Sequence, residues 1–201
     1  MTNRKDEIVE TATRLFAERG YEGASMGDLA ECVGLRKASL FHHYASKDDL
    51  YIAVIECLVG RLGGLVAQTA SGPGTFSEKL DRMTDATFDA FVTEPFAARL
   101  MVREMMDWGP FAKKSFETVA KPVLHASEAF LLSGQKEGVA REQDPRQALL
   151  TLISAHLLPY SIGTLIESAW GVSPFSPDFA AERKKAVRAH IRAFVLKPEY
   201  A

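Results

Sequence analysis

The chain has little cysteine and no arrangement of it that suits a metal or a disulfide framework. Only two of the 201 residues are cysteines, and Cys32 and Cys57 lie far apart rather than in a Cys-x-x-Cys pair. Thiols of this kind are typical of small buried side chains in a reducing compartment. The first ten residues also lack the apolar core of a secretory signal. We therefore expect a cytoplasmic protein with no metal site and no cofactor.

The familiar catalytic motifs are missing as well. The sequence contains no His-Glu-x-x-His motif, no phosphate-binding loop and no Gly-x-Ser-x-Gly turn. Helical oxygen-activating enzymes need paired Glu-x-x-His motifs, and none occurs here. The one suggestive pair, His125 and Glu128, stands alone and is interpreted as incidental. We predict that the protein is not an enzyme.

The chain carries no excess of positive charge, because it has 24 basic and 26 acidic residues and a formal net charge of −2. Any binding to nucleic acid must therefore come from a local patch. Residues 148–166 carry no formal charge over almost the length of a bilayer span. However, His156, Pro159 and several hydroxyl groups make this a poor spanning segment. We predict a helix buried on two sides, with no membrane partner.

Strand patterns are also lacking, and apolar residues recur at three and four positions, which predicts an all-α fold of about nine helices. Residues 8–16 place Ile8, Leu15 and Phe16 on one helical face, and Gly20 favours a helix end. Ser25 and Ser46 each precede an aspartate by three positions, as in a capping box. The later helices are predicted at 46–71, 76–93, 96–108, 111–136, 145–170 and 177–196, with kinks at Pro122 and Pro159.

What the chain does contain is a basic segment at 25–47 that predicts two short helices broken at Gly34. Its second half carries cations, histidines and aromatic residues but no acid. In a helix-turn-helix, the second helix enters the major groove while the first crosses the DNA backbone. Leu35 and Leu40 can anchor the second helix, which leaves its basic face for phosphates and base edges.

The same residues resemble the tetracycline-repressor (TetR/AcrR) family of bacterial transcription regulators. The resemblance covers about the first quarter of the chain, and its motifs are highly specific in combination. One departure is Arg36, which stands where the family often has a helix-capping serine. The matching motifs are Ala12-x-x-Leu15-Phe16-Ala17-x-x-Gly20-Tyr21, Ser25-x-x-x-Leu29-Ala30-x-x-x-Gly34-Leu35, Lys37-Ala38-Ser39-Leu40-Phe41-x-His43-Tyr44 and Ser46-Lys47-x-x-Leu50.

The resemblance implies a three-helix DNA-binding domain at residues 1–48 and a helical domain for ligand binding and dimerisation at 49–201. Adjacent histidines could suggest a metal site, but successive helical side chains point about 100° apart, which disfavours one. Phosphate contacts are implied for Ser25, His43, Tyr44 and Lys47, and groove-facing roles for Arg36, Lys37, Ser39, Phe41 and His42.

For the larger domain, the resemblance implies a four-helix dimer interface built from the last two helices of each subunit. An apolar central section rich in Phe, Met and Trp is either an ordinary core or an adaptable ligand pocket. The basic residues at 183–192 are interpreted as a solvated face. The predicted interface residues are Leu149, Leu152, Ile153, Leu158, Ile162, Val187, Ile191 and Phe194. The predicted ligand residues are Phe88, Phe91, Met101, Met105, Trp108, Phe130, His156 and Tyr160.

The functional hypothesis that results is a repressor that binds double-stranded DNA at a palindromic operator as a homodimer. A small apolar or amphipathic effector would release it by changing the separation of the two recognition helices. The alternative is the same fold without small-molecule control, as a constitutive or protein-regulated DNA binder.

Overall fold

The structure is a computed structural model that describes residues 4–201. Within that range the only extended pairing is an isolated antiparallel bridge between Ala140 and Leu196, so the all-α prediction is confirmed. The helices are α1 Arg4–Gly23, α2 Met26–Cys32, α3 Lys37–His43, α4 Lys47–Ser71, α5 Phe76–Thr93, α6 Pro95–Asp107, α7 Pro110–Ser115, a π-helical turn η1 Phe116–Ala120, α8 Lys121–Lys136, α9 Pro145–Ser161, α10 Gly163–Trp170 and α11 Pro177–Val195.

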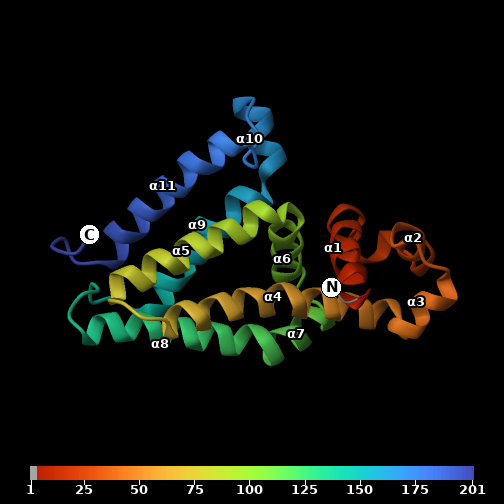
Figure 1. Cartoon of the computed structure of the whole chain (residues 1–201), viewed down its shortest axis with the longest axis horizontal. Coiled ribbons are helices and arrows are strands. Elements are labelled where there is room, and N and C mark those ends of the chain that lie inside the picture. The colour runs from red at the N-terminus through yellow and green to blue at the C-terminus, as the bar shows by residue number, and fades with distance from the viewer. Residues whose placement is uncertain (1–3) are drawn as a thin grey trace.

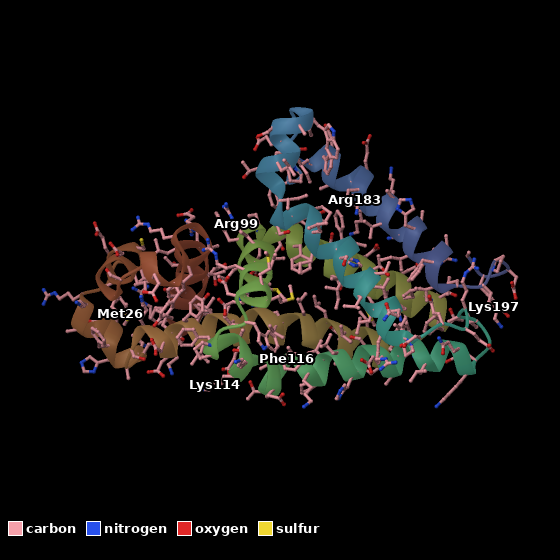
Figure 2. All side chains as sticks on the ribbon, turned by 180° about the vertical axis from the view of Figure 1, so that it is seen from behind. Met26, Arg99, Lys114, Phe116, Arg183 and Lys197 are labelled. Carbon is pink, nitrogen blue, oxygen red and sulfur yellow. The ribbon has the colours of Figure 1, made fainter. Side chains whose placement is uncertain are left out.

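The molecule is elongated, with a small head at one end and a larger helical domain behind it (Figure 1). Helices α1, α2 and α3 form the head, and α4 runs from the head along the larger domain. Helix α8 lies beside α4, α11 packs along α5, and α10 projects away from α4 and α8. Figure 2 shows Met26 in the head and Lys197 near the opposite end of the molecule. Helix α4 therefore connects the two parts directly.

The head has its own apolar core. Phe16, Leu29, Leu40 and Tyr51 are fully buried in it, one from each of the first four helices. The face predicted for α1 is thus confirmed as a buried face. The predicted end at Gly20 is also a real discontinuity, since its φ of 73° breaks the helical backbone before a last turn to Gly23.

Two of the predicted helices are interrupted in the structure, which is why it has more than nine. The segment predicted at 111–136 contains the π turn at Phe116–Ala120, which ends two residues before Pro122. Proline has no N–H for the helical ladder, and a wide turn relieves the clash that its ring would cause. The segment predicted at 145–170 breaks at Ile162, and α9 and α10 meet there at 66°.

Side-chain caps fix several helix starts. Ser25 and Asp28 form a full capping box, and the hydroxyl of Ser46 accepts from the backbone N–H of Asp49 at 3.1 Å, as predicted. Hydrogen bonds from Ser25 hold the pKa of the Asp28 carboxyl below its usual range. Arg36 precedes α3 and makes no side-chain cap, so the recognition helix begins without one.

A ladder of ion pairs joins α5 to α11. Asp81 pairs with Arg192 (2.8 Å between Oδ2 and Nη1), Asp85 with Arg188, and Asp89 with Lys184 (2.7 Å between Oδ2 and Nζ). The aspartates recur every four residues on α5, so they follow one face of the helix. The basic run was interpreted as a solvated face, and these three cations stay partly exposed while they pair with aspartates about a hundred residues away in sequence.

The middle rung of this ladder should contribute modestly to stability. Arg188 donates to both carboxylate oxygens of Asp85, and the two side chains are partly exposed. A double-mutant cycle with Asp85→Ala and Arg188→Ala should give a coupling free energy of about 0.5–1 kcal/mol. Urea unfolding of the four proteins at low and high salt measures it. A coupling that does not fall at high salt would contradict an electrostatic origin.

Two stretches of the described chain have the length and hydropathy of a membrane span. One is α4, and the other is the bent pair α9 and α10. In this fold α4 instead packs against α1, α5, α6, α7 and α8 as the central helix.

Candidate nucleic-acid interface and ligand cavity

The turn between α2 and α3 is fixed by its backbone. Gly34 has a φ of 64°, and its N–H donates to the carbonyl of Glu31 at 3.0 Å. The N–H of Leu35 donates to the carbonyl of Ala30 at 2.8 Å, which completes a Schellman motif. The guanidinium of Arg4 also donates to the carbonyl of Val33 at 2.8 Å. The tight turn predicted at Gly34 is therefore confirmed, and it sets the angle at which α3 leaves α2.

Helix α3 presents a basic outer face. Leu40 is fully buried, while Arg36, Lys37 and His42 are exposed and the Phe41 side chain remains 42% exposed. Within residues 4–201, the ion pairs of the structure involve neither Arg36 nor Lys37. Cations on such a face can contact phosphates and guanine edges. The exposed aromatic ring beside them can contact thymine methyl groups.

The other predicted DNA contacts in the head are half-buried or already hydrogen-bonded within the protein. Ser39, His43 and Tyr44 are half-buried, and burial raises the pKa of the Tyr44 hydroxyl. The ammonium of Lys5 lies 5.9 Å from the centre of the Tyr44 ring. The hydroxyl of Ser25 is engaged in the capping box, where it donates to Asp28 at 2.6 Å. A phosphate contact from these residues stays a prediction.

Lys47 makes internal contacts that the sequence did not reveal. Its ammonium donates to the carbonyls of Tyr21 at 2.9 Å and Ala24 at 3.2 Å, and lies 4.0 Å from the centre of the Tyr21 ring. Lys47 therefore ties the first turn of α4 to the end of α1. Its predicted phosphate contact would have to use the same ammonium from this fixed position.

Four aromatic rings connect the head with the larger domain. Tyr51 on α4 packs edge-on against Phe16 (4.7 Å between ring centres), Tyr21 (5.0 Å) and Phe111 of α7 (5.3 Å). The hydroxyl of Tyr51 donates to the carboxylate of Glu104 on α6. Burial raises the pKa of that hydroxyl, so it stays protonated as a donor. The four residues recur at no regular sequence spacing, so a periodicity pattern could not have found this cluster.

A cavity of about 330 Å³ lies inside the larger domain, between α4, α5, α6, α8 and α9. Figure 2 places Phe116 in the layer of α7 and η1, and sulfur atoms lie beside α6. The wall is almost entirely aliphatic, aromatic or thioether. Six of the eight predicted ligand residues line it: Phe91, Met101, Met105, Trp108, Phe130 and His156.

The other two predicted ligand residues, Phe88 and Tyr160, are not among the lining residues. Their rings pack edge-on at 5.7 Å, and both side chains are buried in the core of the larger domain. The hydroxyl of Tyr160 is buried without a hydrogen-bond partner.

His156 is a buried polar residue of the cavity wall. Its Nδ1 lies 2.8 Å from the carbonyl of Leu152 and its Nε2 3.3 Å from the carbonyl of Thr84. Burial lowers the pKa of the imidazole, so the neutral form is favoured. A neutral imidazole has one N–H, so it can donate to only one of these two carbonyls. His156 therefore offers the cavity no charge.

The predicted dimer seam needs correction, because much of it faces inward. Leu149, Leu152, Ile153 and Ile191 line the cavity, and Val187 is buried in the core of the larger domain. Of the other three, Leu158 is 51% exposed, whereas Ile162 and Phe194 are half-buried. The exposed apolar side chains of α9 and α10 are Leu150, Leu158, Leu165 and Trp170.

Comparison with known proteins identifies the family. Residues 8–54 match "Bacterial regulatory proteins, tetR family", and residues 77–191 match "Tetracyclin repressor-like, C-terminal domain". The chain belongs to the tetR family. Membership in a family of regulators also confirms the prediction that the protein is not an enzyme.

Two curated relatives are similar to this TetR protein over about a third of its length. The negative regulator IcaR of the biofilm operon icaADBC, from Staphylococcus aureus (strain Newman), is 37% identical over 62 residues, which are 31% of this chain and 33% of IcaR. The repressor AcnR of Corynebacterium diphtheriae is 40% identical over 68 residues, 34% of this chain and 36% of AcnR. The chain thus spans about a third of the length of these relatives.

Solved structures extend the similarity to nearly the whole TetR chain. PfmR from Thermus thermophilus has 25% identity and a TM-score of 0.74, with 94% of this chain and 99% of PfmR covered. KstR2 of Mycobacterium tuberculosis has 20% identity and a TM-score of 0.77, with 98% and 97% covered. AibR, solved with isovaleryl coenzyme A and operator DNA, has 19% identity and a TM-score of 0.73, with 94% and 98% covered. The last two show that the fold is shared.

Proposed function

We propose that this TetR-family protein represses transcription by binding a palindromic operator as a homodimer, and that a small apolar or amphipathic effector releases it. The observation that carries the proposal is the exposed basic face of α3, with Arg36, Lys37 and Phe41 held outward on a head whose turn is fixed at Gly34. A short helix held in this way suits the major groove. Such a regulator acts on DNA in the cytoplasm, which is the location we propose.

Dimerisation is supported by the outer apolar surface of α9 and α10. Leu158 and Trp170 are 51% and 68% exposed, and Leu150 and Leu165 are exposed too. A group of large apolar side chains outside the fold indicates an interaction surface. A second copy of the chain is the occupant we propose, since a palindromic operator needs two recognition helices.

Effector control is supported by the cavity. Its volume of about 330 Å³ lies at the lower end of the range for small-molecule sites, and its apolar wall suits such a ligand. A constitutive DNA binder has no need of an apolar pocket of this size. The cavity therefore favours the ligand-responsive form of the proposal over the constitutive one.

The DNA-binding proposal predicts a specific result for Lys37→Ala. Loss of this groove-facing cation from both subunits should weaken binding to the gene's own upstream region about tenfold or more, and should relax preference at particular base pairs. Electrophoretic mobility shifts at several salt concentrations measure this.

The control is Lys114→Ala, which removes an exposed lysine from α7, outside the head (Figure 2). It should leave operator affinity unchanged. If the wild-type protein shifts no genomic fragment at low salt, the proposed function fails.

A further inference from the structure

The cavity wall carries formal charge of one sign only among the described residues, and that sign is negative. Among the described residues that line the cavity, Glu104 alone has a formally charged side chain, and no lysine or arginine is present. A ligand with a carboxylate or a phosphate would enter an apolar space without a counter-ion and would face a carboxylate. Burial of an unpaired charge of this kind is strongly unfavourable. The wall therefore disfavours anionic ligands.

Glu104 has one neutral hydrogen-bond donor and one nearby cation, which is not part of the cavity wall. Glu104 is half-buried on α6, and its Oε1 accepts from the hydroxyl of Tyr51. The neighbouring cation, Arg103, is not part of the wall, because its guanidinium lies against Gly20 in the head. A β-carbon added to Gly20 would lie 2.8 Å from Nη1 of Arg103. The carboxylate thus has a neutral donor but no cation inside the cavity.

Two further features lie on the same side of the cavity. The rings of Trp108 and Phe116 line it and meet edge-on at 5.2 Å. Aromatic faces attract ammonium groups, and Trp108 is 45% exposed at this edge of the cavity. Ser115, only 2% exposed and also in the wall, has a buried hydroxyl without a hydrogen-bond partner. A buried polar atom without a partner calls for an explanation, and a ligand that hydrogen-bonds to it would provide one.

We propose that the effector is a cationic amphiphile, with an apolar body in the cavity and one ammonium group paired with Glu104 beside Trp108 and Phe116. The inference rests on the proposed function, because it names the ligand class of the same cavity. Met83, Leu131 and Leu152 line other parts of the wall and suit the apolar body. The neutral His156 adds no charge that would compete with this pairing.

The position of Glu104 also connects such a ligand with the head. The carboxylate that would pair with the ammonium is the acceptor of the Tyr51 hydroxyl, and Tyr51 packs against Phe16 and Tyr21 of α1. A ligand that draws Glu104 toward itself competes with that hydrogen bond. A ligand can shift the orientation of the head only if some contact to the head differs between the bound and the unbound state. The hydrogen bond between Tyr51 and Glu104 is such a contact.

Three probes with the same alkyl chain test the charge preference: decyltrimethylammonium, 1-decanol and decanoate, each below its micelle concentration. Calorimetry and thermal shift should show the ammonium probe binding about tenfold or more tightly than the alcohol, with decanoate weakest. In the variant Glu104→Gln the ammonium probe should lose this advantage, while the affinity for the alcohol should stay within about twofold.

Glu137→Gln is the matched control, since Glu137 is an exposed carboxylate at the end of α8 and not part of the wall. It should retain the wild-type order of affinities. Circular dichroism of each variant without ligand serves as a check of its fold. If the alcohol or decanoate binds the wild type as tightly as the ammonium probe, or if no probe binds, the inference is overturned. Operator binding without ligand would still support the proposed function in either case.

Discussion

Replacing Leu158 with glutamate should separate the subunits and lower operator affinity about 100-fold or more. Leu158 lies 51% exposed on α9, among the apolar residues that we propose face a second copy of the chain. Two charges placed opposite each other in that interface would each lose hydration without gaining a partner. A monomer can occupy only one half-site, so it loses the effective concentration that the second head provides.

The matched control is Leu132→Glu, which introduces the same charge at an exposed leucine of α8. Sedimentation velocity should show a monomer for Leu158→Glu and a dimer for the wild type and Leu132→Glu. Operator titrations on the same samples relate assembly to DNA binding. If the Leu158→Glu protein remained dimeric and bound operator normally, the proposed interface on α9 and α10 would be incorrect.

The head could be predicted from sequence because its signals are local. Gly34 supplies the positive φ that the Schellman turn needs, and Ser25 and Ser46 cap helices through partners three residues away. The residues that form its core recur at helical spacing, so their shared face was visible in the pattern. The recognition helix was identified from its local cluster of basic and aromatic residues, whereas the missing cap at Arg36 followed from the resemblance to the family.

The larger domain could be predicted less well, because its determinants are not local. Residues 148–166 are apolar nearly all round, so no polar face indicates how the helix is rotated. Leu152 was placed at the dimer seam, and the structure turns it into the cavity. The ion pair between Asp85 and Arg188 joins residues far apart in the chain. Neither the rotation nor the pairing has a signal in periodicity.

The link between the two parts was also invisible in the sequence. Tyr51 lies within the helix predicted at 46–71, and its ring completes the core of the head while its hydroxyl reaches Glu104 in the cavity wall. Such a residue belongs to both domains, and the boundary predicted after residue 48 runs beside it. The proposed effector control depends on this shared residue more than on either domain alone.

Two phenylalanines of the head should therefore give opposite results when each is replaced by alanine. Phe16 is fully buried against Tyr51, and Phe16→Ala should lower the free energy of unfolding by about 3–5 kcal/mol. Phe41 is 42% exposed on α3, and Phe41→Ala should change the free energy of unfolding by no more than about 0.5 kcal/mol. Its operator affinity should nevertheless fall about tenfold, because an apolar groove contact is lost from both half-sites.

Urea unfolding and operator titration of both variants separate the two roles. The same residue type is removed from the same small domain, so each variant is the control for the other. If Phe41→Ala lost stability as Phe16→Ala does, Phe41 would be a core residue and the assignment of the outer face of α3 to DNA would be wrong. If Phe41→Ala kept both stability and operator affinity, the proposed groove contact of Phe41 would be wrong. Arg36 and Lys37 would then make the groove contacts without it.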